Sequence, residues 1–98
     1  MKRPVELWEI PGPILGRYIK LALDRARCEW DQGGRLWFAE IPGFQGVWAD
    51  AASQEECRKV LGEVLTDWLS HKLRDSDDDI PVLDGIDLLA GINPQTPA

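Results

Sequence analysis

The sequence has no long apolar run, few cysteines and a single histidine. No segment approaches the roughly 20 apolar residues that a membrane-spanning helix needs, and the chain does not open with a signal-peptide pattern. We therefore expect a cytoplasmic protein without a membrane segment. The two cysteines, Cys28 and Cys57, match no metal-binding or redox spacing, so we expect both to be small buried side chains.

Candidate catalytic residues are also scarce. The histidine, His71, follows Ser70, but neighbouring helix residues point in different directions and cannot form a nucleophile–base pair. Asp31, Glu40 and Asp50 lie near predicted strand ends, and carboxylates that converge on one face of a sheet can hold Mg²⁺ for phosphodiester cleavage. Because Asp31 and Asp50 fall in predicted turns, we expect no such convergence. The sequence predicts no enzyme activity, no metal site and no cofactor.

Basic residues are outnumbered, with 11 Lys and Arg against 17 Asp and Glu and a net charge of −6. Nucleic-acid binders draw much of their affinity from Lys and Arg that neutralise phosphates, so this balance argues against a nucleic-acid binder. The balance suits a basic protein partner, because opposite electrostatic fields accelerate encounter.

Bulky aromatic and apolar residues gather in Leu36–Asp50, which Pro and Gly residues interrupt at Pro42–Gly46. Such side chains favour a pleated, half-buried surface, and Pro and Gly favour turns. The pattern predicts strands over Arg35–Ile41 and Val47–Asp50 joined by a short corner. The first of these strands is apolar on nearly all positions, which is typical of a central strand or of a strand that faces another chain.

A further strand is predicted just before this stretch. Ala26–Asp31 alternates apolar and charged residues with a period of two, which indicates a strand with one buried face. Asp31–Gly34 then predicts a tight hairpin in which the two glycines take positive φ. Strands joined this closely are expected to form an antiparallel meander.

Two helices flank these strands. Apolar residues recur at three- and four-residue steps from Ile14 to about Arg25, which predicts an amphipathic helix. Ser53 and Glu56 match a capping box at the start of a second helix. A broad apolar stripe then runs from Cys57 to Leu73, and we expect this helix to cover the sheet.

The order of elements predicts an α+β domain with a three- to four-stranded antiparallel sheet covered by helices. Ile80–Leu83 is the candidate fourth strand at an edge, followed by a turn at Asp84-Gly85. We expect an N-terminal arm over residues 1–13, the folded domain over residues 14–89 and a tail over residues 90–98.

The aromatic residues of the strands exceed what one face of a small sheet can bury. Some can be core residues, and others can form a protein interface, where Trp is enriched. The sequence leaves both possibilities open for Trp30, Trp37, Phe38, Phe44 and Trp48.

Several segments in order resemble the HicB-like antitoxins of bacterial toxin–antitoxin systems. These are the aromatic strand after an acidic-Gly turn, the segment Glu40–Ala49, Ser53-x-x-Glu56 at a helix start, and Ile80-Pro81-Val82 with Asp84-Gly85. The resemblance covers about residues 18–88. It implies a truncated ribonuclease-H-like layer without the catalytic carboxylates. Relatives are typically dimers or higher oligomers, and we expect a homodimer or higher oligomer here.

The resemblance also implies a role, which is binding a small basic HicA-like toxin, an mRNA-cleaving ribonuclease. Many full-length members add a ribbon–helix–helix or helix–turn–helix region that binds DNA. This chain ends nine residues after Leu89 and is acidic, so we do not expect direct DNA binding.

Our leading hypothesis is therefore a non-enzymatic antitoxin that sequesters its toxin through the aromatic sheet and an acidic rim. The alternatives are a homo-oligomeric regulatory or small-ligand-binding module of the same fold without a toxin, and a metal-dependent nuclease. The residues expected near the partner are Trp37, Glu40, Phe44, Trp48 and Asp50.

Overall fold

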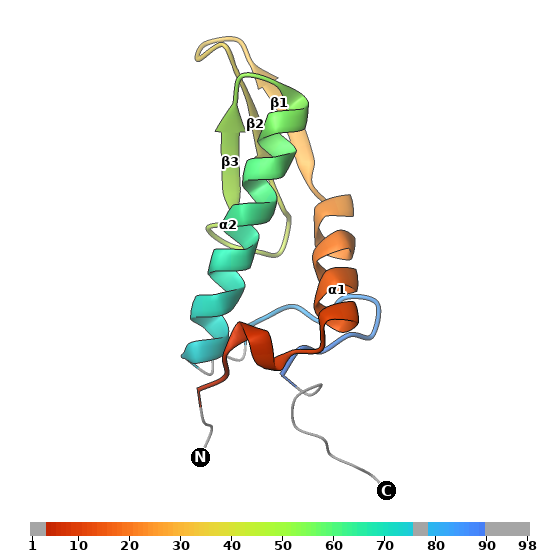
Figure 1. The fold of residues 1–98 in the computed structure, drawn as a ribbon. Coiled ribbons are helices and arrows are strands. Elements are labelled where there is room, and N and C mark those ends of the chain that lie inside the picture. Colours follow the sequence, from red (N-terminus) through yellow and green to blue (C-terminus); the bar gives the residue numbers. More distant parts are fainter. Residues whose placement is uncertain (1–3, 76–78, 90–98) are drawn as a thin grey trace, which may run out of the picture.

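The computed structural model describes residues 4–75 and 79–89. The domain is an α+β fold with two α-helices and one antiparallel sheet of three strands in the order β1-β2-β3 (Figure 1). The fold class predicted from the sequence is thus confirmed. In chain order the elements are a 3-10 helix η1 (Leu7–Glu9), α1 (Gly12–Asp24), β1 (Arg27–Asp31), β2 (Leu36–Glu40), β3 (Trp48–Ala51) and α2 (Gln54–Arg74).

The sheet contains three strands among the described residues, and the predicted fourth strand does not join it. Instead, Leu83 forms an isolated bridge with Ile86. Asp84 and Gly85 both have positive φ, at 52° and 81°, so they close a tight turn at the predicted place. The segment before this turn is used for packing, because Ile80 and Leu83 are buried in the core.

The hairpin between β1 and β2 differs from its prediction in one respect. Positive φ occurs at Arg35, at 56°, and not at the two glycines. A Cβ atom at Gly34 would lie 3.0 Å from Oδ2 of Asp31, a tight contact that a small shift of the exposed Asp31 side chain would relieve. The Asp31 carboxylate turns into the loop and accepts a hydrogen bond of 3.1 Å from the Gly33 amide.

The connection between β2 and β3 is a double turn, residues 41–47. The Phe44 amide donates to the Ile41 carbonyl and the Val47 amide to the Phe44 carbonyl, each at 3.1 Å. Gly43 and Gly46 occupy the third position of the two turns with a φ of 90°, as a type II turn requires. The Pro and Gly spacing therefore explains this corner without invoking a ligand.

Helix α2 is the longest element and runs along the whole domain (Figure 1). The Ser53 hydroxyl caps its first turn by accepting a hydrogen bond of 3.1 Å from the Glu56 amide, as predicted. The helix has 21 residues, about 30 Å at 1.5 Å per residue. Its fully buried side chains recur every four residues and form one row, Cys57, Leu61, Leu65, Leu69 and Leu73.

The N-terminal part of this row packs on the sheet, where two small residues allow a close approach. Ala39 and Ala49 are cross-strand partners and both are buried. The Cys57 Sγ lies over them, within 3.4 Å of the Trp37 carbonyl and 3.5 Å of the Ala49 carbonyl. Burial raises the pKa of the Cys57 thiol, which suits its expected role as a small buried side chain.

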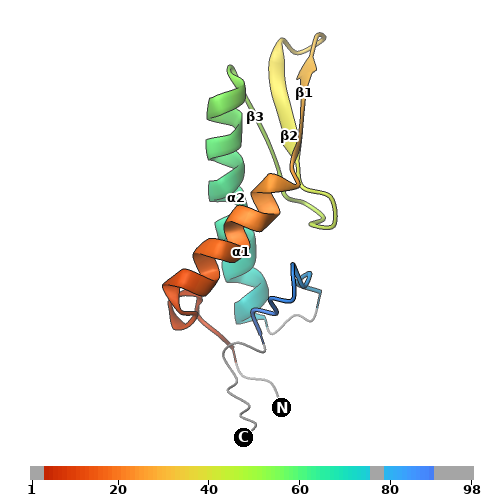
Figure 2. The same cartoon turned by 90° about the vertical axis from the view of Figure 1, so that its right-hand side faces the viewer.

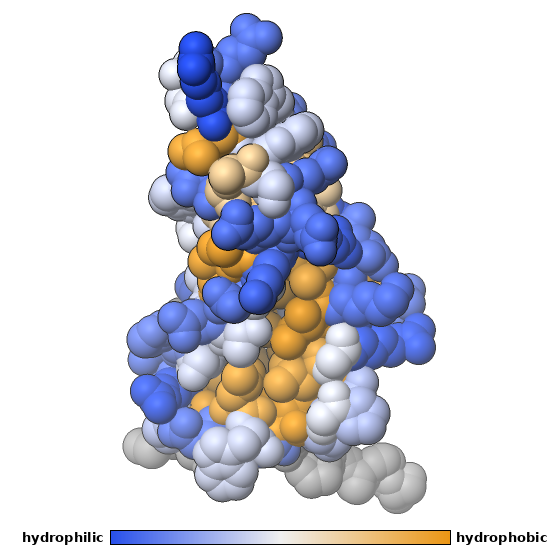
Figure 3. All heavy atoms as spheres, turned by 45° about the horizontal axis from the view of Figure 1, so that its top comes forward, coloured by the Kyte–Doolittle hydropathy of each residue, from blue (hydrophilic) through white to orange (hydrophobic). Residues whose placement is uncertain are grey.

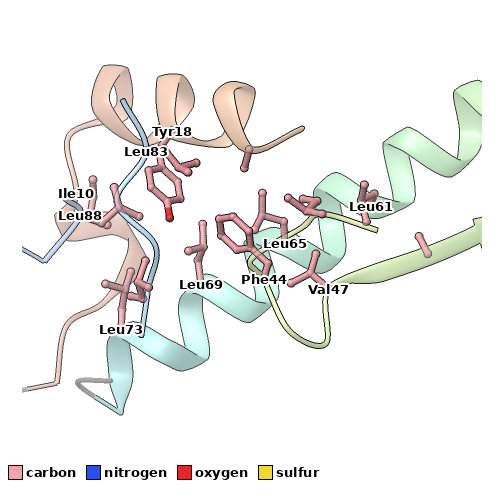
Figure 4. Packing of buried hydrophobic residues seen from close by; sticks show 14 of the residues in the cluster. Ile10, Tyr18, Phe44, Val47, Leu61, Leu65, Leu69, Leu73, Leu83 and Leu88 are labelled. Carbon is pink, nitrogen blue, oxygen red and sulfur yellow. The ribbon is translucent and has the colours of Figure 1, made fainter. Parts of the chain in front are cut away.

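Farther toward the C-terminal end of α2, the row packs against aromatic residues from two other segments. Tyr18 of α1 and Phe44 of the double turn enter the same space beside the α2 leucines (Figure 4). Their ring centroids are 6.3 Å apart, and Phe44 lies 5.3 Å from Trp68, both pairs in edge-to-face geometry. Phe44 therefore connects the sheet, α1 and α2.

Helix α1 packs beside α2 and is held at its C-terminal end by Arg58. The guanidinium donates to the Leu23 carbonyl at 3.1 Å and to the Asp24 carboxylate at 3.2 Å. The described part of the predicted arm also packs on α2: the Val5 amide donates to the Leu73 carbonyl at 3.0 Å. Val5 is buried with the core.

The helical side of the domain carries apolar side chains. Figure 3 shows them as a band between hydrophilic margins. Both helices contribute partly buried apolar residues that pack against the core, among them Leu15, Ile19, Leu23, Val60 and Val64. In the part of the chain that the structure describes, no helix has both the length and the apolar character needed to cross a bilayer.

Tyr18 provides a test of how α1 is joined to the C-terminal segment. Its hydroxyl donates to the Pro81 carbonyl, and its ring is fully buried. We expect Tyr18→Phe to lower the free energy of unfolding at pH 7 by about 1–2 kcal/mol, because the carbonyl loses its donor. Urea unfolding followed by tryptophan fluorescence measures this difference.

The same variant tests the pH dependence of stability. Burial, and secondarily the negative charge of Asp87, raises the pKa of the Tyr18 phenol. The folded state therefore retains the proton more strongly than the unfolded chain, and stability falls once pH exceeds the unfolded pKa of about 10. Between about pH 9 and 11 we expect the unfolding free energy to fall more steeply in the parent than in Tyr18→Phe. Parallel pH profiles would contradict this.

Candidate functional site

Among the described residues, the sheet is covered on one face only. Helix α2 packs against β2 and β3 from one side, and no described element lies on the other side of the sheet (Figure 2). Because side chains alternate along each strand, every second residue points to this uncovered side. We call it the open face, and it consists of Arg27, Glu29, Asp31, Leu36, Phe38, Glu40, Trp48 and Asp50.

Aromatic rings occupy the centre of the open face. Phe38 lies on β2 and Trp48 on β3. Phe38 pairs with Asp50, and Trp48 pairs with Glu40, so the two aromatic residues are diagonal neighbours across the strands. Their rings are stacked, with centroids 5.9 Å apart and planes inclined by 24°. Trp48 keeps 52% of its surface exposed. An uncovered aromatic pair of this kind is unusual for a purely structural sheet and typical of protein interfaces.

Carboxylates surround the rings. Phe38 lies between Glu29 and Asp50 in one cross-strand row, and Glu40 lies beside Trp48 in the next. Within residues 4–75 and 79–89, the side chains of Glu29, Glu40 and Asp50 have no hydrogen bond or ion pair. They are exposed and free to pair with an incoming cation.

The balance of charge on the open face is negative. It carries four carboxylates, those of Glu29, Asp31, Glu40 and Asp50, and one guanidinium, that of Arg27. Exposed charges interact weakly in pairs, but a patch of one sign sets up a field that attracts an oppositely charged partner.

A shallow hollow of about 510 Å³ lies where the open face meets the double turn. Phe38, Glu40 and Trp48 line it on the sheet side, and residues 41–47 line it on the other. The double turn, which forms one side of the hollow, is attached to α2, because the Trp68 indole N–H donates to the Gln45 carbonyl at 3.1 Å. The hollow thus combines aromatic surface, a carboxylate and a fixed backbone.

The structure brings three of the expected partner residues together and separates two. Glu40, Trp48 and Asp50 share the open face. Trp37 lies on the opposite face, in edge-to-face contact with Trp30 at 5.6 Å. Phe44 lines the hollow but is only 3% exposed and belongs to the core, so it offers a partner very little surface.

Two contributors to the open face, Phe38 and Glu29, were not among the residues expected near the partner, although Phe38 was one of the aromatics left open as core or interface. Phe38 is on the same side as Glu40 because the two residues stand two positions apart on β2, and strict alternation could have placed it there. Glu29 joins it through the register with Phe38, which depends on the number of residues in the hairpin turn. The sequence pattern does not determine that number.

The carboxylates considered for a metal site do not all converge. Asp31 pairs with Leu36 and Glu40 with Arg27, so these two carboxylates lie at opposite ends of the hairpin, roughly 13 Å apart along the strands. No group of three or more potential metal ligands occurs among the described residues. His71 lies exposed near the end of α2, away from the open face.

Comparison with known proteins identifies the family. The sequence model of the UPF0150-like family matches residues 17–81, and the chain belongs to this family. It is similar to the crystal structure of TTHA0281 from Thermus thermophilus, with 36% sequence identity and a TM-score of 0.68. That match covers 74% of this chain and 89% of the other. Comparison with curated protein sequences gives no match.

The division between core and surface aromatics can be tested by paired truncations. We expect Phe44→Ala to lower the free energy of unfolding by about 3–5 kcal/mol, since it empties the junction of three segments. Trp48→Ala should cost less than about 1 kcal/mol, because half of the side chain is already in water. Chemical denaturation of both variants measures the contrast, and equal losses would show that Trp48 is a structural residue.

Proposed function

We propose that this chain is a HicB-like antitoxin that binds and neutralises a small basic HicA-like toxin in the cytoplasm, without catalysing a reaction itself. The observation that carries the proposal is the open face, an uncovered aromatic centre surrounded by unpaired carboxylates. The segments that resemble HicB-like antitoxins support it, since Glu40–Ala49 and the capped start of α2 both fall within the family match.

The physical requirements of toxin neutralisation match this face. A ribonuclease that binds mRNA presents Lys and Arg to the phosphates, so its RNA-binding surface is attracted to carboxylates. A protein that covers the same cations excludes RNA by competition and needs no chemistry of its own. Long-range attraction also accelerates the encounter, which suits a protein that must capture its toxin quickly.

Exposed aromatic side chains supply the affinity that surface charges lack. Exposed ion pairs contribute little each, whereas truncation of an interfacial Trp commonly costs more than about 2 kcal/mol of binding energy, roughly thirtyfold. Under this proposal Trp48 and Phe38 form the centre of the contact, and Glu29, Glu40 and Asp50 form its rim.

Co-expression provides the direct test. The proposal predicts that a small basic HicA-like protein is encoded beside this chain. Expressed alone, that protein should arrest growth, and co-expression of this chain should restore it. We expect the two to co-purify as a complex, because neutralisation depends on binding. The matched control is the same toxin with its catalytic histidine replaced by alanine, which should be harmless alone and still bind.

Two results would contradict the proposal. One is the lack of any toxic basic neighbour that this chain rescues. The other is rescue without a stable complex, which would indicate an indirect effect. In either case a homo-oligomeric module of the same fold becomes the better description, and sedimentation of the isolated protein would give its assembly state.

A further inference from the structure

We propose that the hollow beside Trp48 receives an arginine side chain of the basic partner, with the guanidinium held between the Phe38–Trp48 stack and the Glu40 carboxylate. This inference rests on the proposed function in taking the partner to be a basic protein. It adds which surface of the chain is used and which chemical group is recognised there.

The aromatic pair is suited to a planar cation. The faces of Trp and Phe rings carry negative charge density, and Trp attracts cations most strongly. Here the two rings are stacked, inclined by 24°, and Trp48 keeps 52% of its surface exposed, so aromatic surface remains available on the open face. A guanidinium can stack flat on such a surface, whereas the ammonium of lysine is attracted to aromatic faces too but is more strongly hydrated and has no plane to stack.

Glu40 supplies the opposite charge at the right place. It is the direct cross-strand neighbour of Trp48, and such neighbours have Cβ atoms roughly 5 Å apart. Its carboxylate lines the hollow and has no ion pair or hydrogen bond within the described residues. A carboxylate accepts a guanidinium through two parallel hydrogen bonds, which fixes the orientation of the arginine as well as its position.

Arg27 determines on which side of Glu40 the cation binds. In the register it lies across from Glu40 on β1, opposite to Trp48 on β3. The Arg27 guanidinium would repel a cation that approached Glu40 from its own side. A cation over Trp48 approaches Glu40 from the other side, farther from Arg27. The single basic residue of the face therefore directs the partner's arginine toward the hollow.

The hollow is already formed before binding. Two backbone hydrogen bonds hold the double turn, and Trp68 fixes it to α2. A preformed site loses little conformational entropy when it is occupied, so more of the contact energy appears as affinity. This distinguishes the hollow from a mobile surface loop.

A second copy of this chain is a poor occupant. A symmetric pair would bring the same face of both copies together, and each face carries four carboxylates against one guanidinium. The chain has a net charge of −6, so the copies also repel at a distance. Charge complementarity favours a basic partner.

Matched variants test the site. Glu40→Gln and Trp48→Ala change the hollow, while Glu63→Gln on α2 and Trp8→Ala in η1 remove the same groups from exposed positions elsewhere. The probe is the small basic HicA-like protein that the proposed function predicts beside this chain, with its catalytic histidine replaced by alanine. Isothermal titration calorimetry at low and high salt gives the affinity, and thermal unfolding confirms that each variant is folded.

We expect Glu40→Gln and Trp48→Ala each to weaken binding about tenfold or more, and the two control variants to change it less than about twofold. Glu40→Gln should also reduce the loss of affinity with added salt, because one charge pair is removed. Trp48→Phe should retain most of the affinity, since it keeps an aromatic face. In a double-mutant cycle, one arginine of the toxin should couple with Glu40.

The outcomes separate this inference from the proposed function. If the parent binds the toxin but the hollow variants bind as tightly as the controls, the arginine site is wrong and the antitoxin function stands. If only a toxin lysine couples with Glu40, the guanidinium specificity is wrong. If the parent does not bind, the proposed function fails as well. A homodimer that Trp48→Ala dissociates would assign the face to a second copy and overturn the inference.

Discussion

The packing of α2 on the inner face of the sheet is the interaction on which the rest of the structure depends. One row of side chains, from Cys57 to Leu73, is fully buried along the helix. The sheet accommodates this row closely because Ala39 and Ala49 leave room for the Cys57 side chain. Burial of such a row, at about 25 cal/mol per Å², is a major source of stability.

Within residues 4–75 and 79–89, this packing leaves the opposite face of the sheet without cover. A domain of 98 residues has one core, and here the helices and the described C-terminal segment are all used on one side and at one end of the sheet. Tyr18, Phe44 and Leu83 fill the part of that core beside the C-terminal half of α2 (Figure 4). The open face is therefore a consequence of how the core is built, and the residues placed on it are not constrained by internal packing.

Local sequence signals predict the helices, strands and turns. They do not predict the contacts between segments that lie far apart in the sequence. The capping residue Ser53 and the turn at Asp84-Gly85 follow from chemistry within a few residues, and both were found as expected. Ile80–Leu83 was assigned to the sheet because an apolar segment next to Pro is compatible with an edge strand. Its actual position depends on the Tyr18 hydroxyl, 63 residues away in sequence, which donates to the Pro81 carbonyl.

The candidate site shows the same division. Trp48 and Asp50 could be assigned to one face of β3 because strand alternation determines it once the strand is known. Glu40 joins them only through the register between β2 and β3. Phe44 belongs to the same aromatic stretch of the sequence, but the two type II turns direct it inward, and no periodicity applies within a turn. Aromatic content alone thus cannot separate a core residue from an interface residue.

An exposed aromatic pair on a three-stranded sheet with two edges also invites self-association. The carboxylates around Phe38 and Trp48 oppose it, since every other copy of the chain presents the same charges. Glu29 and Asp50 lie on the two edge strands, where charged side chains also discourage strand pairing between molecules. The residues that would attract a basic toxin are thus the ones that keep this face of the free protein from binding itself. Because both effects come from the same carboxylates, replacing them with neutral residues should weaken toxin binding and promote self-association together.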